Sequence, residues 1–243
     1  MSRRPRRPSA LAALVATAAA LVLAPLAAHG QGDELALRRR MVAEQVAGRG
    51  LDDPRVLAAM AEVPRHLFAP EADLATAYAD RPLAIGYGQT VSQPYVVALI
   101  TSLAGLGPGD RVLEIGTGSG YHTAVLSRVA GRVYSIEIIE PLAREAARRL
   151  ARLGYDNIEL RVGDGYQGWA EEAPFDAIVL TAAPPRIPQP LIDQLRIGGR
   201  MVVPVGGTIQ DLQVLTRTAE GLEKRTVIPV RLQPMTGQVR EDG

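Results

Sequence analysis

Residues 112 to 120 constrain the fold of this chain more than any other stretch. They read Val-Leu-Glu-Ile-Gly-Thr-Gly-Ser-Gly, an apolar run that leads directly into alternating glycines. A short apolar run is typical of a buried strand, and glycines let the backbone turn sharply and approach a ligand closely. The amides that open the following helix then point at the bound group. The stretch therefore predicts a strand, a turn and a helix that together hold a nucleotide-type cofactor.

The spacing of the glycines separates two classes of cofactor. Gly116, Gly118 and Gly120 follow the pattern G-x-G-x-G. A dinucleotide site has G-x-G-x-x-G, and Tyr121 stands where its third glycine would fall. This disfavours NAD and FAD and favours S-adenosylmethionine, which has no pyrophosphate. We expect Glu114, two residues before the first glycine, to meet the ammonium group of the methionine part; the competing interpretation is a glycine-rich turn without a ligand.

Two more acidic residues follow the next two predicted strands. The strand near 132–137 ends in Glu137, about 20 residues beyond the glycines, which is the distance at which a βαβ unit brings an acid to a ribose. The strand near 158–162 is followed by Asp164 in a Gly-Asp-Gly turn, and we expect this carboxylate to accept from the adenine amino group. Ligands of open α/β sheets bind at the carboxyl ends of the strands. Cofactor contacts are therefore predicted at three successive strand ends.

Strands and helices alternate through the rest of the sequence, and this defines the fold class. Such alternation is typical of an α/β protein with a mostly parallel seven-stranded sheet and helices on both faces. The last two strands have no helix between them, so we expect an antiparallel hairpin at the sheet edge. Strands are predicted near 111–116, 132–137, 158–162, 176–181, 200–205, 211–217 and 226–232, and helices near 34–50, 53–62, 94–103, 119–130, 141–153 and 188–196.

Residues 1–30 have the composition of an export signal. Arginines at positions 3, 4, 6 and 7 precede an uncharged, Ala/Leu-rich run over 10–28, and small residues stand at the candidate cleavage site near Gly30. The run approaches the ~20 residues of a membrane-spanning helix, so an uncleaved anchor stays open. A twin-arginine signal and a buried core helix are weaker interpretations, and a start at Met41 would remove the leader together with the first turns of a helix.

The remainder, 31–243, is expected to form one α/β domain, with a helical part over 33–107 and the cofactor-binding sheet over 108–243. It contains no cysteine, which excludes disulfides, cysteine-ligated zinc and a thiol nucleophile. The three histidines are too scattered in the sequence to propose a metal site. Removing the arginines of the leader turns the net charge of +1 negative, so nothing indicates a nucleic-acid partner.

The segment from Gly86 to Tyr95 reads Gly-Tyr-Gly-Gln-Thr-Val-Ser-Gln-Pro-Tyr. Taken alone, it predicts that Ser92 caps the helix that opens at Pro94. The segment also resembles the motif of protein-L-isoaspartate (D-aspartate) O-methyltransferases, and the resemblance extends over nearly all of residues 35–237. It includes Arg55 to Met60, Val63 to Arg65, Pro82 to Gly86, Val112 to Tyr121, Gly163 to Gly165, Gly168-Trp169, Ala173 to Ile178, Thr181 to Ala183, Gly198 to Arg200 and Pro204 to Gly206.

This resemblance implies a Rossmann-like class I methyltransferase that uses S-adenosyl-L-methionine. The acceptor is then the α-carboxylate of L-isoaspartyl residues in damaged proteins and peptides, whose ester closes to a succinimide and so begins repair. The active-site serine of the family falls on Ser92, which we expect to orient the reactants together with Thr90. The predicted catalytic residue is Ser92, and the predicted cofactor residues are Thr90, Val91, Ser92, Glu114, Gly116, Gly118, Gly120, Glu137, Ile138, Asp164 and Gly165.

The leader departs from the resemblance, because this family is usually cytosolic. We therefore expect export to the periplasm or the medium, with a cytoplasmic location as the alternative. Two other functions stay open: a methyltransferase that acts on a small molecule, and an exported binding protein that keeps the fold without turnover. We expect a monomer that binds isoaspartyl proteins, no nucleic acid, and no membrane unless the leader is uncleaved.

Overall fold

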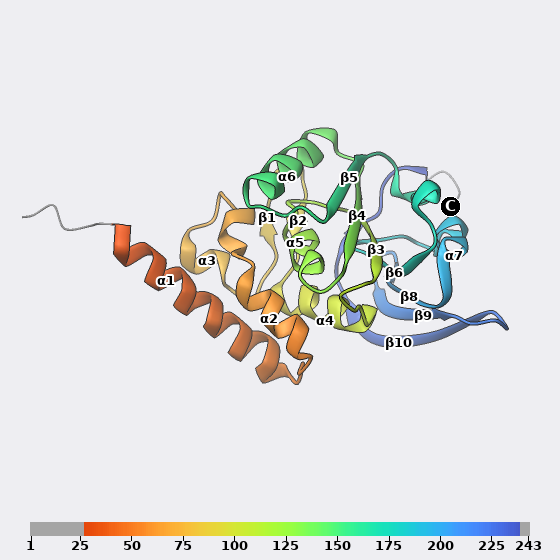
Figure 1. Ribbon diagram of the computed structural model, residues 1–243, viewed down its shortest axis with the longest axis horizontal. Helices are drawn as coiled ribbons and strands as arrows, with labels where there is room; N and C mark the ends of the chain where they lie inside the picture. The colour runs from red at the N-terminus through yellow and green to blue at the C-terminus, as the bar shows by residue number, and fades with distance from the viewer. Residues whose placement is uncertain (1–26, 239–243) are drawn as a thin grey trace, which may run out of the picture.

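Seven strands form the central sheet: β3 (Arg111–Ile115), β4 (Arg132–Glu137), β5 (Ile158–Val162), β6 (Phe175–Leu180), β8 (Leu195–Gly206), β9 (Gln210–Arg217) and β10 (Leu222–Val230). The computed structural model describes residues 27–238, so all but the last residues of the proposed leader lie outside it. The strand order is β10-β9-β8-β6-β3-β4-β5, with parallel pairing from β8 to β5 (Figure 1). β9 pairs antiparallel with both β8 and β10, which confirms the predicted edge hairpin.

Apolar side chains are buried on both faces of the central sheet. Successive residues of a strand point to opposite faces. On β3, Val112 packs into one hydrophobic core and Leu113 into the other. Near-continuous apolar runs of this kind are characteristic of parallel strands covered on both faces. The first core also contains Val133, Ala177 and Val202, and the second contains Ile136, Ile178 and Met201.

Helices cover the two faces unequally. The first core includes residues of α2 (Pro54–Glu62), α4 (Pro94–Ala104), α5 (Tyr121–Ser127) and α6 (Glu140–Arg152). The second core is covered by the short α7 (Gln189–Asp193), by Tyr166 of the turn η4 (Gly165–Gln167), and by Trp169 and Ala173 on either side of the turn η5 (Ala170–Glu172). Asp53 caps α2, accepting from the amides of Arg55 at 3.0 Å and Val56 at 3.4 Å.

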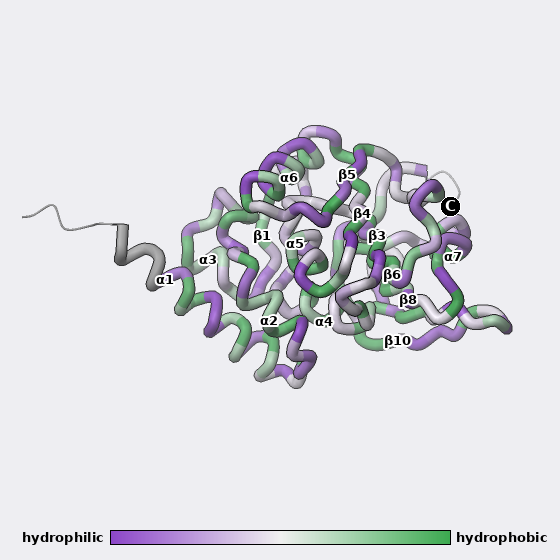
Figure 2. Tube along the Cα trace, viewed as in Figure 1, coloured by the Kyte–Doolittle hydropathy of each residue, from purple (hydrophilic) through white to green (hydrophobic). Residues whose placement is uncertain are grey.

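The N-terminal helical segment is longer and less regular than predicted. It comprises α1 (Ala27–Arg40), a π-type turn η1 (Met41–Val46) and a 3-10 turn η2 (Ala47–Arg49), and it ends at Gly50, whose φ is 87°. α1 extends along one end of the molecule, and Figure 2 shows apolar and polar residues alternating along it. The Glu34 carboxylate lies 3.0 Å from His66 Nε2 and holds α1 to the domain. No helix within residues 27–238 is both long and apolar enough to cross a membrane.

Two regions differ from the sequence prediction. The helix predicted over 188–196 is only α7, because β8 begins at Leu195, which is buried and pairs with Phe175. Gly198 and Gly199 lie in an irregularity of β8 itself, where the pairing register with β6 shifts. The stretch 63–87, predicted to be irregular, contains η3 (Arg65–Phe68), α3 (Leu74–Ala77) and β1 (Leu83–Ala84).

Two small strand pairs complete the fold around the sheet. β1 pairs antiparallel with β2 (Thr90–Val91), which forms a hairpin directly before α4. β7 (Ala182–Ala183) pairs in parallel with β11 (Gln233–Pro234), which brings the C-terminal segment back across the carboxyl edge of the sheet. Both pairs lie beside the cavity described below.

Candidate active site

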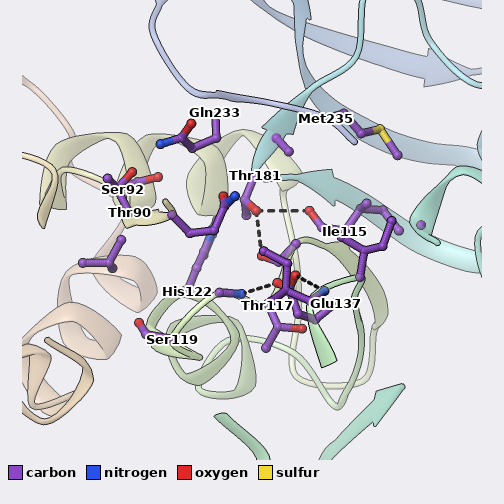
Figure 3. Close-up of a pocket in the computed structure, with 18 of the residues that line it drawn as sticks. Thr90, Ser92, Ile115, Thr117, Ser119, His122, Glu137, Thr181, Gln233 and Met235 are labelled. Atoms are coloured by element: carbon purple, nitrogen blue, oxygen red, sulfur yellow. Dashed lines mark hydrogen bonds between the residues drawn. The ribbon is translucent and has the colours of Figure 1, made fainter. Parts of the chain in front are cut away.

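A cavity opens at the carboxyl ends of β3 and β4, where the glycine turn follows β3 (Figure 3). Four separate parts of the chain line most of it: residues 89–92 of the β1–β2 hairpin, residues 115–119 of the glycine turn, residues 136–139 at the end of β4, and residues 233–236 of the C-terminal segment. Open α/β sheets bind ligands at this edge. The cavity is therefore where the sequence predicted the cofactor.

The glycine turn is closely packed beneath the cavity. Gly116 has a φ of 97°, and a Cβ at this position would lie 2.3 Å from Thr181 Oγ1. The Thr181 hydroxyl donates to the Gly116 carbonyl at 2.6 Å, and the Ile115 carbonyl lies 3.1 Å away. Gly118 has a φ of 56°, which also favours glycine. The turn is thus fixed from below by a side chain of the neighbouring strand end.

Glu137 joins the turn to the end of β4. Its Oε2 accepts from the Gly118 amide at 2.8 Å and its Oε1 accepts from the Ile139 amide at 3.0 Å. The side chain is buried and lines the cavity. Because each carboxylate oxygen has a second acceptor site, Glu137 is able to accept two further hydrogen bonds from hydroxyl groups in the cavity. This arrangement suits the ribose diol that the sequence spacing predicted.

Glu114 lies behind the cavity wall. It is fully buried, and its Oε2 accepts from Thr123 Oγ1 at 2.5 Å and Ser135 Oγ at 2.6 Å. Its Oε1 has no hydrogen-bond partner and lies 4.0 Å from His122 Nδ1. Burial raises the pKa of Glu114 to about 8, which favours its neutral form. Glu114 is not among the residues that line the cavity, so the structure does not show the contact that we expected with the cofactor ammonium.

Gly120 and Asp164 also lie outside the cavity wall, for two different reasons. Gly120 lets α5 approach α6, because a Cβ there would lie 3.3 Å from the Leu150 side chain. The Asp164 carboxylate accepts from the Tyr166 amide at 2.9 Å and from the Gln238 amide at 2.7 Å, so the C-terminal segment already engages it. The predicted residues that do line the cavity are Thr90, Val91, Ser92, Gly116, Gly118, Glu137, Ile138 and Gly165.

Ser92 does not cap α4. The N-cap residue is Gln93, and no side chain caps the helix. Pro94 occupies the first helical position and has no N–H to offer. Among the residues that the structure describes, no hydrogen-bond partner is found for the half-buried Ser92 hydroxyl. The capping interpretation is therefore wrong, and this hydroxyl is available to a ligand.

A second, open groove of about 830 Å³ adjoins the cavity. The residues that line the groove include Arg49 and Tyr95, the turn between β8 and β9, and residues 228–234. The groove and the cavity have five residues in common, which we call the shared wall: Thr90, Ser92, Thr181, Gln233 and Pro234. A ligand in the cavity and a ligand in the groove therefore meet at these side chains.

Several residues that line the cavity were not predicted from the sequence. Thr181 directly follows β6, so its position after a strand could have indicated it, as the end of a strand indicated Glu137. Gln233 donates to the Gly88 carbonyl at 3.4 Å and thereby connects the C-terminal segment to the hairpin loop. This short segment has no periodic pattern, so nothing in the sequence indicated its position. Figure 3 shows Gln233 and Ser92 at the same side of the cavity, with Met235 across from them.

His122 is a further lining residue, and it is neutral. Its Nε2 lies 3.0 Å from Thr101 Oγ1, whose hydrogen goes to the Val97 carbonyl at 2.8 Å, so Nε2 is the protonated nitrogen. Burial lowers the pKa of His122 to about 3. Within residues 27–238, no cluster of three His, Asp or Glu side chains is placed to hold a metal ion.

Known proteins resemble this chain over most of its length. The family model described as protein-L-isoaspartate(D-aspartate) O-methyltransferase matches residues 37–240. A protein-L-isoaspartate O-methyltransferase of a Picosynechococcus strain is 54% identical over 203 residues, which are 84% of this chain and 91% of that protein. Protein-L-isoaspartate O-methyltransferase 1 of Cupriavidus necator is 48% identical and the match covers 97% of this chain and 95% of that protein.

Solved structures agree with these relatives. A protein-L-isoaspartate O-methyltransferase superposes with a TM-score of 0.76 at 30% identity, covering 83% of this chain and 67% of that one. A Plasmodium falciparum protein-L-isoaspartate O-methyltransferase in complex with S-adenosyl-L-homocysteine superposes with a TM-score of 0.72 at 26% identity, covering 82% of this chain and 98% of that one.

Proposed function

Because this chain belongs to the protein-L-isoaspartate(D-aspartate) O-methyltransferase family, we propose that the cavity holds the methyl donor and the groove holds the damaged peptide. The enzyme is an S-adenosylmethionine-dependent methyltransferase that acts on isoaspartyl residues. The observation that carries the assignment of the two ligands is the shared wall between cavity and groove. A methyl transfer requires donor and acceptor to meet at one point, and the shared wall provides it.

The polar groups of the cavity fit the methyl donor. Gly116 and Gly118 line the cavity with positive φ, and a Cβ at Gly116 would collide with Thr181, so glycine is needed to keep the turn in this shape. Glu137 offers two acceptor sites to the ribose hydroxyls, and its position is held by two backbone amides. S-adenosylmethionine supplies a methyl group that its positively charged sulfur makes electrophilic.

The acceptor needs no general base. The α-carboxylate of an isoaspartyl residue has a pKa near ~3.5, so it is already ionised at pH 7. We propose that Ser92 is the catalytic residue and that its hydroxyl donates to this carboxylate, with Thr90 beside it. Such hydrogen bonds hold the nucleophilic oxygen in line with the methyl group, and exclusion of water from the cavity strengthens them. Holding the reactants in place is then the main contribution of the protein.

The discriminating experiment compares two synthetic peptides that differ only in one linkage. One peptide contains an L-isoaspartyl residue and its twin contains ordinary aspartate, and transfer of a labelled methyl group to each is measured with the purified enzyme. We expect a base-labile ester on the isoaspartyl peptide and none on its twin. Cofactor binding without methylation of either peptide would favour the small-molecule methyltransferase, or the binding protein if no acceptor is found.

We propose in addition that residues 1–30 export the enzyme and that the mature chain begins near Gln31. One observation supports this: the arginines at positions 3, 4, 6 and 7 are followed by the uncharged, Ala/Leu-rich run over 10–28. A reporter fused to residues 1–30 should appear outside the cytoplasm without its leader. Recovery in the membrane fraction would indicate an uncleaved anchor, and a cytosolic reporter with its leader intact would contradict export.

A further inference from the structure

The groove beside Ser92 carries a local positive charge. Within the part of the chain that the structure describes, two arginines, Arg49 and Arg231, line the groove, and no aspartate or glutamate does. The whole chain, in contrast, has 27 basic and 26 acidic residues. The charge of the groove is therefore a property of this surface and does not follow from the composition. A surface of one sign attracts ligands of the other sign.

Arg49 is held in the groove by its aromatic neighbour. Its guanidinium carbon lies 3.6 Å from the centre of the Tyr95 ring, which is the geometry of a cation–π contact. Tyr95 belongs to the first turn of α4, three residues after Ser92, so the cation is anchored to the helix that follows the catalytic loop. The Arg49 side chain keeps 44% of its accessible surface. Its charge is thus positioned and still open to a ligand.

Asp80 partly balances this charge. Its Oδ2 lies 3.4 Å from the Arg49 Nη1, and Asp80 itself does not line the groove. A guanidinium has five N–H donors, so one contact with Asp80 leaves donors for a second carboxylate. Because the ion pair is exposed to water, it weakens the field of Arg49 without cancelling it. Removing Asp80 should then make the groove more positive.

We propose that Arg49, with Arg231 as a second cation, makes the enzyme prefer isoaspartyl peptides that carry a further carboxylate beside the damaged residue. The inference rests on the proposed function, since it requires the isoaspartyl α-carboxylate at Ser92 with the flanking residues in the groove. Arg49 is then a specificity-determining residue that acts on the neighbours of the reacting carboxylate. Acidic peptides are bound better, and lysine-flanked peptides are bound less well.

Three peptides of one length test this, with glutamate, glutamine or lysine on both sides of the isoaspartyl residue. KM and kcat are measured for the full-length enzyme and for Arg49→Gln, Asp80→Asn and Arg55→Gln. Arg55 is a matched control, because it is an arginine with a half-exposed side chain that pairs with Asp53 and does not line the groove. Melting temperature and cofactor affinity of each variant establish that its fold is intact.

We expect the lowest KM for the glutamate peptide and the highest for the lysine peptide in the unmodified enzyme. Arg49→Gln should reduce the KM ratio of these two peptides by about two- to fivefold, the effect of an exposed charge contact, while Asp80→Asn should increase it. Arg55→Gln should leave the ratio unchanged, and added salt should reduce it in the unmodified enzyme. A ratio that Arg49→Gln and Asp80→Asn leave unchanged would overturn the inference, whereas failure to methylate any of the peptides would contradict the proposed function itself.

Discussion

The cavity and the groove meet at the shared wall but are built in opposite ways. In the cavity the polar groups are engaged before any ligand arrives: Glu137 accepts two amide hydrogens and the Thr181 hydroxyl holds the Gly116 carbonyl. In the groove, two polar side chains keep capacity for a ligand: the Ser92 hydroxyl has no partner among the described residues, and the Arg49 side chain is 44% exposed. One region is preorganised and the other is open.

The two ligands explain this difference. The methyl donor is always the same molecule, so a rigid site loses little entropy on each binding event. Damaged peptides differ in every residue except the reacting one, and a site that is deep and exact for one sequence would exclude the rest. The comparison predicts that substitutions in the cavity change cofactor affinity and that substitutions in the groove change the use of the acceptor.

The largest effect should follow Gly116→Val, which breaks the cavity itself. The new Cβ would lie 2.3 Å from Thr181 Oγ1 at a residue whose φ is 97°, so both crowding and backbone strain oppose it. We expect a loss of about 4 kcal/mol or more in cofactor binding, measured by calorimetry. Gly109→Val is the control, because a Cβ at Gly109 meets no atom within 4 Å. Unchanged affinity in Gly116→Val would mean that the cofactor does not lie on this turn.

Ser92→Ala tests the boundary between the two regions. Loss of one orienting hydrogen bond in a water-excluded site costs ~2 to 4 kcal/mol of transition-state stabilisation, or roughly 30- to 1,000-fold in single-turnover rate. The melting temperature should stay the same, since Ser92 does not cap α4. The control is Ser102→Ala within α4, which should change neither the single-turnover rate nor the melting temperature. A fall in melting temperature at an unchanged rate would assign Ser92 a purely structural role.

Glu137→Ala should weaken cofactor binding by about 1 to 3 kcal/mol and leave the KM for the peptide nearly unchanged. The variant removes the charged acceptor of the ribose and also frees the Gly118 amide that Glu137 holds. Isothermal titration with the cofactor measures the first effect. Glu140→Ala is a suitable control, since this glutamate lies on the surface and pairs with Arg144. A larger effect on peptide than on cofactor would contradict the separation of the two regions.

Glu114→Gln should produce the smallest effect, a change in how stability depends on pH. The pKa of Glu114 is raised from 4.5 to about 8 in the folded protein, so the unfolded chain ionises first and stability falls as pH rises from 4.5 to 8. His122 acts in the other direction below pH 6.5, because its pKa is lowered to about 3 and the unfolded chain takes up the proton first. The loss between pH 6.5 and 8 therefore belongs to Glu114.

Melting temperatures at pH 6.5 and pH 8 measure this effect. Glutamine cannot ionise, so Glu114→Gln should show a smaller difference between the two temperatures than the unmodified enzyme. Asp176→Asn provides a comparison, since Asp176 is a carboxylate near the amino end of a strand that holds the Arg111 amide at 2.7 Å. Equal differences in the unmodified enzyme and in Glu114→Gln would show that Glu114 is already ionised at pH 6.5.

The cavity was more predictable from the sequence than the groove, and the reason is chain distance. The turn at Gly116 and the acid at Glu137 belong to one βαβ unit, whose geometry relates them through a fixed spacing. Arg49 and Gln233 come from distant parts of the chain and lie on one groove only in the folded structure. No periodicity or motif spacing encodes such a meeting.

The sequence also did not show how deeply each predicted side chain is buried or which neighbours it contacts. Glu114 and Asp164 lie near the expected strand ends, but other protein groups bind their carboxylates. Glu114 accepts from Thr123 and Ser135, and Asp164 accepts from the Gln238 amide. The position of a residue along a strand does not determine which neighbouring groups form hydrogen bonds with its side chain. The central strands β3 and β6 were predicted well, because each is a mostly apolar run, whereas β10 contains several charged residues and begins at Leu222, ahead of the predicted residue 226.

The shared wall has a consequence for the surroundings in which the enzyme can work. Its five residues are two threonines, a serine, a glutamine and a proline, and none of these side chains ionises between pH 5 and 9. An isoaspartyl carboxylate is also charged throughout that range, so we expect the rate of methyl transfer to be nearly constant across it until unfolding intervenes. The residues of the shared wall have no protonation state to lose when the enzyme moves between compartments. It is equally suited to a buffered cytoplasm and to an environment whose acidity the cell does not control.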